Sequence, residues 1–195
     1  MKKFRKIVAK LVSRIFDPVW EIPFAILLAV AFAIQEGLRW RFLGILLFVD
    51  AVVPMIFFLI MLRNKQIKDW DIQKRAQRIP LYMFTLICHL GGLWLTYELG
   101  KDGLFPILLV FYIVAIAIVF FIITLKYKIS LHAGVNAVLI TAINMFYGWK
   151  YFWLYGLLYL VMWARVYQKH HTWGQVISGA LLGTLIVGVG LSTIN

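Results

Sequence analysis

Residues Leu104–Leu125 read LFPILLVFYIVAIAIVFFIITL and contain no charged side chain. An α-helix needs about 20 consecutive apolar residues to cross the hydrocarbon core of a bilayer, and this stretch is long enough. The whole chain of 195 residues is 63% hydrophobic, whereas a soluble domain is roughly 45–50% apolar. The sequence therefore predicts an all-α integral membrane protein.

Six further apolar stretches accompany this one, and together they predict a bundle of six or seven transmembrane helices. The first and sixth stretches are short, at about 14–16 residues, so a bundle of six spans stays open. No linker or internal repeat divides the chain, and we expect one membrane domain over residues 1–195. The seven stretches are Trp20–Gln35, Phe42–Leu62, Leu81–Tyr97, Leu104–Leu125, Leu131–Tyr147, Tyr151–Ala164 and Val176–Ile194.

The chain carries a net charge of +12, and its basic residues begin at the N-terminus. Residues 1–16 read MKKFRKIVAKLVSRIF, with apolar residues at helical spacing, which is typical of an amphipathic helix at a membrane interface. Anionic lipid headgroups, or a phosphate held at the membrane face, explain this charge better than nucleic acid does. The single cysteine, Cys88, excludes a disulfide within the chain.

The connections between apolar stretches alternate in charge. Basic connections follow the second, fourth and sixth stretches, whereas the others are short and less charged. With seven spans, the basic connections lie on the same side as the basic N-terminus, and the positive-inside rule places that side in the cytoplasm. The basic connections are RNKQIKDWDIQKRAQR (63–78), KYKIS (126–130) and RVYQKHH (165–171).

The basic connections also carry residues capable of phosphate chemistry. Guanidinium groups match phosphate oxygens in a bidentate way, and histidine can act as a nucleophile or a proton donor near neutral pH. The connections therefore predict an anion site with a nucleophile and an acid. The candidates are Lys68, Arg75 and Arg78 before a helix predicted to begin at Pro80, then Ser130 and His132, then Arg165, His171 and Gln175.

The order and spacing of these residues resemble the type 2 phosphatidic-acid phosphatase family, which includes the vanadium haloperoxidases. The third motif of that family, Ser-Arg-x5-His-x3-Asp, corresponds here to Ala164-Arg165-VYQKH-His171-TWG-Gln175. Its second motif, Pro-Ser-Gly-His, corresponds to Ile129-Ser130-Leu131-His132.

The first motif of the family, Lys-x6-Arg-Pro, fits this chain in two imperfect registers. Lys68 precedes Arg75 at the right distance but without the proline, and Arg78-Ile79-Pro80 lacks the lysine. The resemblance covers about residues 68–183, which form a phosphatase-like core, and leaves the first two apolar stretches outside.

The resemblance implies a reaction without metal or other cofactor. His171 would attack phosphorus and form a phosphohistidine, and His132 would protonate the leaving oxygen and then activate water. Thr172 would cap the last helix and direct its positive end to the phosphate. The phosphate oxygens would be held by Arg165, Ser130, the backbone N–H of Leu131, Arg75 or Arg78, and Lys68.

Two positions depart from the family pattern. Gln175 replaces the aspartate that orients the nucleophilic histidine; its amide oxygen can accept the histidine Nδ1–H, but it carries no charge and its amide nitrogen can also donate. Leu131 replaces a glycine, which leaves the backbone N–H in place but crowds the loop.

Other polar residues have structural explanations. His170 lies one position out of register and is expected to contact solvent or headgroups, and His89 to pack against a neighbouring helix. Asp50 lies inside an apolar stretch and is expected to pair with a polar group. Asp69 and Asp71 are expected to be solvated or paired with nearby bases. Close helix packing is expected at Gly179, Gly183, Gly188 and Gly190.

Two functions follow from these residues. The first is a membrane phosphatase acting on a lipid phosphate or diphosphate, such as a polyprenyl phosphate or diphosphate, phosphatidic acid or a phosphatidylglycerol-phosphate type of lipid. The second is a catalytically weak or inactive relative that binds or moves phospholipid, which the neutral Gln175 favours.

Overall fold

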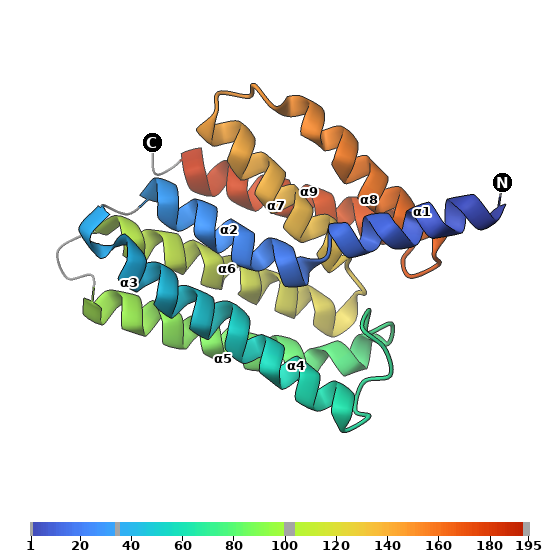
Figure 1. Cartoon of the computed structure of the whole chain (residues 1–195), viewed down its shortest axis with the longest axis horizontal. Coiled ribbons are helices and arrows are strands. Elements are labelled where there is room, and N and C mark those ends of the chain that lie inside the picture. The colour runs from blue at the N-terminus through green and yellow to red at the C-terminus, as the bar shows by residue number, and fades with distance from the viewer. Residues whose placement is uncertain (1, 34–35, 100–103, 193–195) are drawn as a thin grey trace. The chain divides into compact units, whose positions relative to one another are not determined.

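The computed structural model describes residues 2–33, 36–99 and 104–192, and within them it contains helices and no strand (Figure 1). The predicted all-α class is therefore confirmed. A π-helical turn, Phe48–Val52, joins α3 to α4, and a 3-10 turn, Phe152–Leu154, precedes α8. The α-helices are α1 Lys2–Ile15, α2 Pro18–Ala33, α3 Glu36–Leu47, α4 Val53–Arg63, α5 Arg75–Leu99, α6 Leu104–Lys126, α7 Leu131–Phe146, α8 Tyr155–Tyr167 and α9 Trp173–Ser192.

The chain forms two compact units. The first contains residues 1–21 and 128–195, and thus α1, the start of α2, and α7, α8 and α9. The second contains residues 22–127, with the rest of α2 and α3 to α6.

Among the residues that the structure describes, three helical segments are long and apolar enough to cross a membrane: Trp40–Arg63, Arg75–Glu98 and Trp173–Gly190. The first of these is continuous from α3 through the π-helical turn to α4. Within the described residues, each of the seven predicted apolar stretches coincides with a helix. These helices support a membrane protein, whereas the number of spans stays a prediction.

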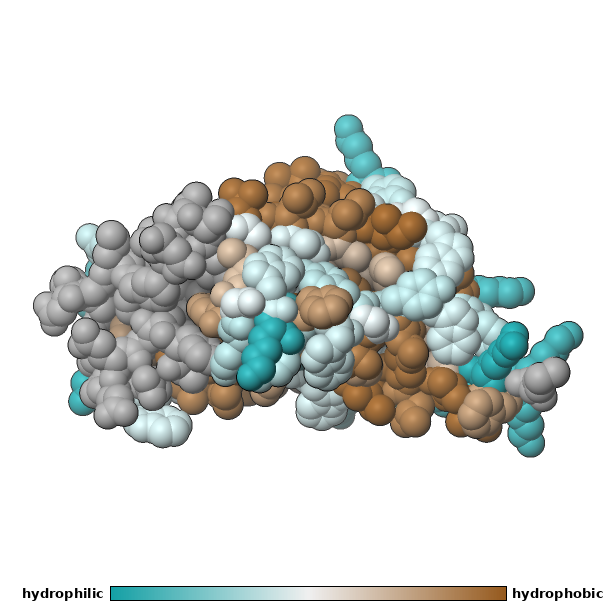
Figure 2. Space-filling model, turned by 90° about the horizontal axis from the view of Figure 1, so that it is seen from above, coloured by the Kyte–Doolittle hydropathy of each residue, from teal (hydrophilic) through white to brown (hydrophobic). Residues whose placement is uncertain are grey.

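Helix α9 has two distinct faces. One face carries an exposed apolar stripe in which every fourth residue is 45–62% exposed: Ile177, Leu181, Leu185 and Val189. Figure 2 shows that hydrophobic residues cover much of the molecular face in view. Exposed apolar surface of this kind is unfavourable in water and suits contact with lipid chains.

Helix α1 also presents two faces, as expected for an amphipathic helix. Ala9 and Val12 are buried with Val161 and Ala164 of α8, in the first unit. The opposite face leaves large apolar side chains exposed, which fits the predicted interfacial position. These side chains are Phe4, Ile7, Leu11 and Ile15.

Helix α5 begins at Arg75, five residues before the predicted start at Pro80. A tertiary contact holds the additional turn, because Arg75 Nη1 donates to the carbonyls of Thr124 and Leu125 in α6. A local bond supports it, since Arg78 Nε donates at 2.7 Å to the carbonyl of Ile72 in the preceding connection. The prediction was wrong because it rested on the preference of proline for the first turn, and such local preferences yield to packing.

Asp50 pairs with a polar group, as predicted. Its Oδ1 lies 2.8 Å from His89 Nδ1, and both side chains are buried in the second unit. Asp50 lies in the π-helical turn, and Gly92 of α5 faces its carboxylate, since a Cβ there would come within 3.1 Å of Oδ1. The pairing lowers the cost of placing an acid in an apolar span.

Candidate functional site

The candidate site of the first unit is built on the close packing of α7 against α9. Glycines on α9 allow the two backbones to approach, because a Cβ at Gly179 would lie 2.6 Å from the carbonyl oxygen of Ser130, and one at Gly183 would lie 2.4 Å from that of Gly134. The prediction of close packing is confirmed at both positions. It is wrong at Gly188, where a Cβ would meet no atom of the described residues outside its own helix backbone within 4 Å.

The start of α7 carries Ser130 and His132, the residues of the predicted second motif. Ser130 is the N-cap of α7, and its Oγ accepts a hydrogen bond from the backbone N–H of Ala133 at 3.4 Å. Its own N–H donates to the carbonyl of Gln175 at 3.2 Å. This backbone bond joins the second predicted motif to the third. Leu131, which lies between Ser130 and His132 in the sequence, is the first residue of α7.

A Schellman turn at the end of α8 sets the spacing of Arg165 and His171. Lys169 has a positive φ of 60°, and its N–H donates to the carbonyl of Val166 at 2.9 Å. The N–H groups of His170 and His171 both donate to the carbonyl of Arg165, at 3.1 and 3.4 Å. Such a turn satisfies carbonyls that the helix end leaves open. The five residues between Arg165 and His171 therefore fold the chain back onto the C-terminal end of α8. Arg165 lies at this end and is only 1% exposed.

Gln175 contacts the His171 ring and caps α9 at the same time. Its Oε1 lies 3.1 Å from His171 Nδ1 and accepts the backbone N–H of Thr172 at 3.2 Å. Thr172 Oγ1 in turn accepts the N–H of Gln175 at 3.4 Å, so these two residues form a capping box. Thr172 caps the last helix, as predicted.

The capping box determines which histidine nitrogen is protonated. The N–H of Thr172 requires an acceptor, so the amide oxygen of Gln175 and not its nitrogen occupies this position. A neutral His171 ring then donates through Nδ1–H to that oxygen, and in this tautomer the lone pair lies on Nε2. A glutamine can thus fix the tautomer that a nucleophilic histidine needs.

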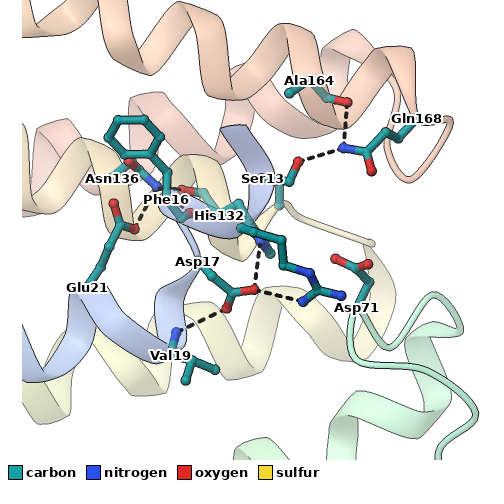
Figure 3. Close-up of polar contacts among 12 residues, drawn as sticks. Ser13, Phe16, Asp17, Val19, Glu21, Asp71, His132, Asn136, Ala164 and Gln168 are labelled. Carbon is teal, nitrogen blue, oxygen red and sulfur yellow. Dashed lines mark hydrogen bonds and ion pairs between the residues drawn. The ribbon is translucent and has the colours of Figure 1, made fainter. Parts of the chain in front are cut away.

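A carboxylate that the sequence motifs do not include lies beside His132. Asp17, between α1 and α2, has its Oδ2 3.8 Å from His132 Nε2 and 3.3 Å from Arg14 Nη1 (Figure 3). Its Oδ1 accepts the N–H of Val19 at 3.2 Å. Burial by itself raises the pKa of Asp17, but His132, the Val19 N–H and Arg14 outweigh burial and hold this pKa below its ordinary value.

A second buried acid lies one helical turn beyond Asp17. Glu21 Oε2 accepts a hydrogen bond from Asn136 Nδ2 at 2.6 Å, and Asn136 also donates to the carbonyl of His132 at 2.8 Å (Figure 3). The sequence gives one signal for the helix start, since an Asp-Pro pair before an apolar run is typical of an N-cap. No motif spacing connects this pair to His132, more than 100 residues further along the chain.

The candidates of the first basic connection belong to the second unit. Arg75 caps the end of α6 through the carbonyls of Thr124 and Leu125, and Arg78 is buried against the carbonyls of Ile72 and Asp71. Lys68 is exposed in the connection between α4 and α5. These arginines have structural tasks within their own unit, and their predicted role in phosphate binding stays a prediction.

The described residues contain no group of three or more His, Cys, Asp or Glu side chains that could hold a metal ion. A scan against models of protein families finds none that matches the chain, and searches of curated proteins and of solved structures find no match either.

Proposed function

We propose that this chain is a membrane phosphatase that removes phosphate from a lipid phosphate or diphosphate through a phosphohistidine at His171. The observation that carries the proposal is the orientation of His171, whose Nδ1 faces Gln175 Oε1 at 3.1 Å while the Thr172 N–H holds the amide oxygen in place. In a neutral histidine that donates through Nδ1–H the lone pair lies on Nε2, which is the proposed nucleophile.

The first step of the proposed reaction transfers the phosphoryl group to His171. Nε2 forms a bond to phosphorus as the bond from phosphorus to the leaving oxygen breaks, and His132 gives its proton to that oxygen. In the second step His132 takes a proton from water, the water oxygen bonds to phosphorus and the N–P bond breaks. Inorganic phosphate and the free His171 result.

Charge stabilisation in this reaction is assigned to Arg165 and Ser130. A guanidinium can bind two phosphate oxygens at once, and the low dielectric around a buried one strengthens the interaction. Lys68, Arg75 and Arg78 are proposed as further phosphate-binding residues on the resemblance alone.

The second candidate function is binding or movement of phospholipid without hydrolysis. The neutral Gln175 favours it, because a carboxylate in that position would also stabilise the positive charge that develops on His171. A polyprenyl phosphate or diphosphate, phosphatidic acid and a phosphatidylglycerol-phosphate type of lipid are the candidate ligands for both functions.

We further propose that the seven apolar helices span the membrane of the cell and that the face carrying the basic connections is cytoplasmic. The excess of Lys and Arg in residues 1–16 and in the three basic connections supports this orientation.

Phosphate release from purified protein tests the first function. We expect the wild type to release inorganic phosphate from at least one of dioleoyl phosphatidic acid, dioleoyl phosphatidylglycerol phosphate and undecaprenyl diphosphate without added metal. His171→Ala and His132→Ala should each reduce the rate at least about 100-fold, the lower bound of what a general acid or base contributes.

His170→Ala is the matched control, because it removes the neighbouring histidine that lies out of register. It should leave the rate within about twofold of the wild type. Release that survives both His171→Ala and His132→Ala would contradict the phosphatase, and saturable binding of the same lipids without any release would favour the second function.

A further inference from the structure

The N-terminal segment lies outside the family resemblance, yet it brings an acid to His132. The Asp17 residue is 3% exposed, and its Oδ2 lies within 4 Å of both His132 and Arg14 (Figure 3). Asp17 and His132 are both buried, and charges that are buried together are screened less by solvent and salt than charges on a surface. Removal of the Asp17 charge is therefore expected to change how readily His132 binds a proton.

We propose that Asp17 is a positioning residue that orients His132 and keeps it protonated as the acid of the reaction. This inference rests on the proposed function, since it assigns a partner to the acid of the same site.

The backbone around Asp17 is fixed by contacts of α1 with α7 and α8. Gln168 Nε2 donates to Ser13 Oγ at 2.6 Å and to the carbonyl of Ala9 at 3.0 Å. Asn136 Nδ2 donates to the carbonyl of Phe16 at 3.3 Å. The residue directly before Asp17 is thus attached to the same helix that carries His132.

The two carboxylate oxygens of Asp17 have separate tasks. Oδ1 caps α2 through the N–H of Val19, and this bond holds the carboxylate in one orientation. Oδ2 then faces His132 and Arg14. The cap therefore prevents the carboxylate from turning away from the histidine.

A carboxylate in this position favours the imidazolium form of His132. Because Asp17 faces Nε2, that nitrogen keeps its proton, and the proton given to the leaving oxygen comes from Nδ1. The same charge helps His132 to recover a proton from water in the second step. The charged groups that face His132 from the neighbouring elements are Asp17, whose Oδ2 lies 3.8 Å from Nε2, and Arg14, which contacts the same carboxylate oxygen. Glu21 on α2 is linked to the backbone of His132 through Asn136. Arg165 on α8 and His171 before α9 belong to the same unit.

The direct test is an NMR titration of histidine side chains in the full-length protein in detergent micelles. His132→Asn identifies the resonance of His132. In Asp17→Asn the pH at which half of His132 is protonated should fall by roughly one unit, as expected for loss of an opposite charge at this distance. An unchanged midpoint in Asp17→Asn would overturn the inference.

Arg14→Gln should shift the protonation midpoint of His132 in the opposite direction. The Arg14 side chain is 44% exposed, so its replacement disturbs the packing little. Loss of this cation should raise the His132 midpoint, because Asp17 then acts on the histidine without a competing positive charge. A downward or absent shift would count against the inference even if Asp17→Asn failed to fold.

Enzyme kinetics in mixed micelles complete the test. The substrate is dioleoyl phosphatidic acid, or whichever of the three lipids the wild type hydrolyses. In Asp17→Asn kcat should fall about tenfold, less than the roughly 10²–10⁴-fold attributed to a general acid, with little change in KM. Asp17→Glu should restore part of both kcat and the midpoint. If the wild type releases no phosphate from any of the three lipids, the proposed function fails, while the titration still decides whether Asp17 controls His132.

Discussion

Single side chains in the first unit combine a structural and a chemical task. Gln175 closes the capping box of α9 and orients His171 with the same oxygen atom. The capping-box pattern accepts Glu or Gln at this position, because either side chain can reach back to the backbone N–H of the N-cap. The departure from the family's aspartate therefore has a local physical explanation.

Gln175→Glu tests the chemical task while it preserves the structural one. The carboxylate keeps the size and capping bonds of glutamine and adds a negative charge beside His171. In a phosphatase we expect kcat to rise, by about tenfold for each 1.4 kcal/mol of added stabilisation of the positively charged His171. Phosphate release from lipid measures the rate.

Gln175→Leu is the companion variant, because it keeps a comparable volume but removes both bonds of Oε1. It should lower the rate and also the melting temperature, since loss of an N-terminal cap costs about 1 kcal/mol. A rate that is equal in wild type and both variants would argue against a role for this residue in orienting His171.

At the scale of elements, the pairing of α7 with α9 decides the geometry of the candidate site. Both helices start at the site, and the backbone bond from Ser130 to Gln175 holds their first turns together. The glycine face of α9 makes this approach possible, while the opposite face presents apolar side chains outward. The spacing between Ser130 and His171 therefore depends on two glycines of α9, Gly179 and Gly183.

Gly179→Ala tests this dependence. The added Cβ would lie 2.6 Å from the carbonyl oxygen of Ser130, so the helices must separate. We expect a loss of about 1–3 kcal/mol in the free energy of unfolding, together with a lower rate of phosphate release. Thermal unfolding in detergent and the lipid assay measure the two effects.

Gly188→Ala is the matched control on the same helix, because no atom from another part of the described chain lies within 4 Å of its added Cβ. It should be neutral or slightly stabilising, as alanine favours the helix over glycine by about 1 kcal/mol. Equal melting temperatures for the two variants would contradict the close-packing interpretation.

At the scale of the whole molecule, the proposed topology requires an odd number of spans. Tags at the two termini should then report opposite sides of the membrane, with the N-terminus in the cytoplasm. Protease protection in sealed vesicles provides the measurement. Both tags on one side would favour six spans and would require reassignment of one basic connection.

Local sequence patterns determined the helical class and the helices that coincide with the seven apolar stretches, because hydropathy and helical period are properties of neighbouring residues. Motif spacing also predicted the contact of His171 with Gln175, since four residues across a helix start bring side chains together. The start of α5 was not predicted, because Arg75 holds it through a backbone carbonyl of α6, 49 residues away in the chain.

The partner of His132 was decided by tertiary structure alone. Asp17 is more than 100 residues away in the chain, and the packing of α1 on α8 with the bond from Asn136 to Phe16 brings it to α7. The sequence by itself determined which residues could carry a proton or bind phosphate. Only the packing of distant helices decided which carboxylate meets which histidine, because contacts between distant segments have no fixed spacing along the chain.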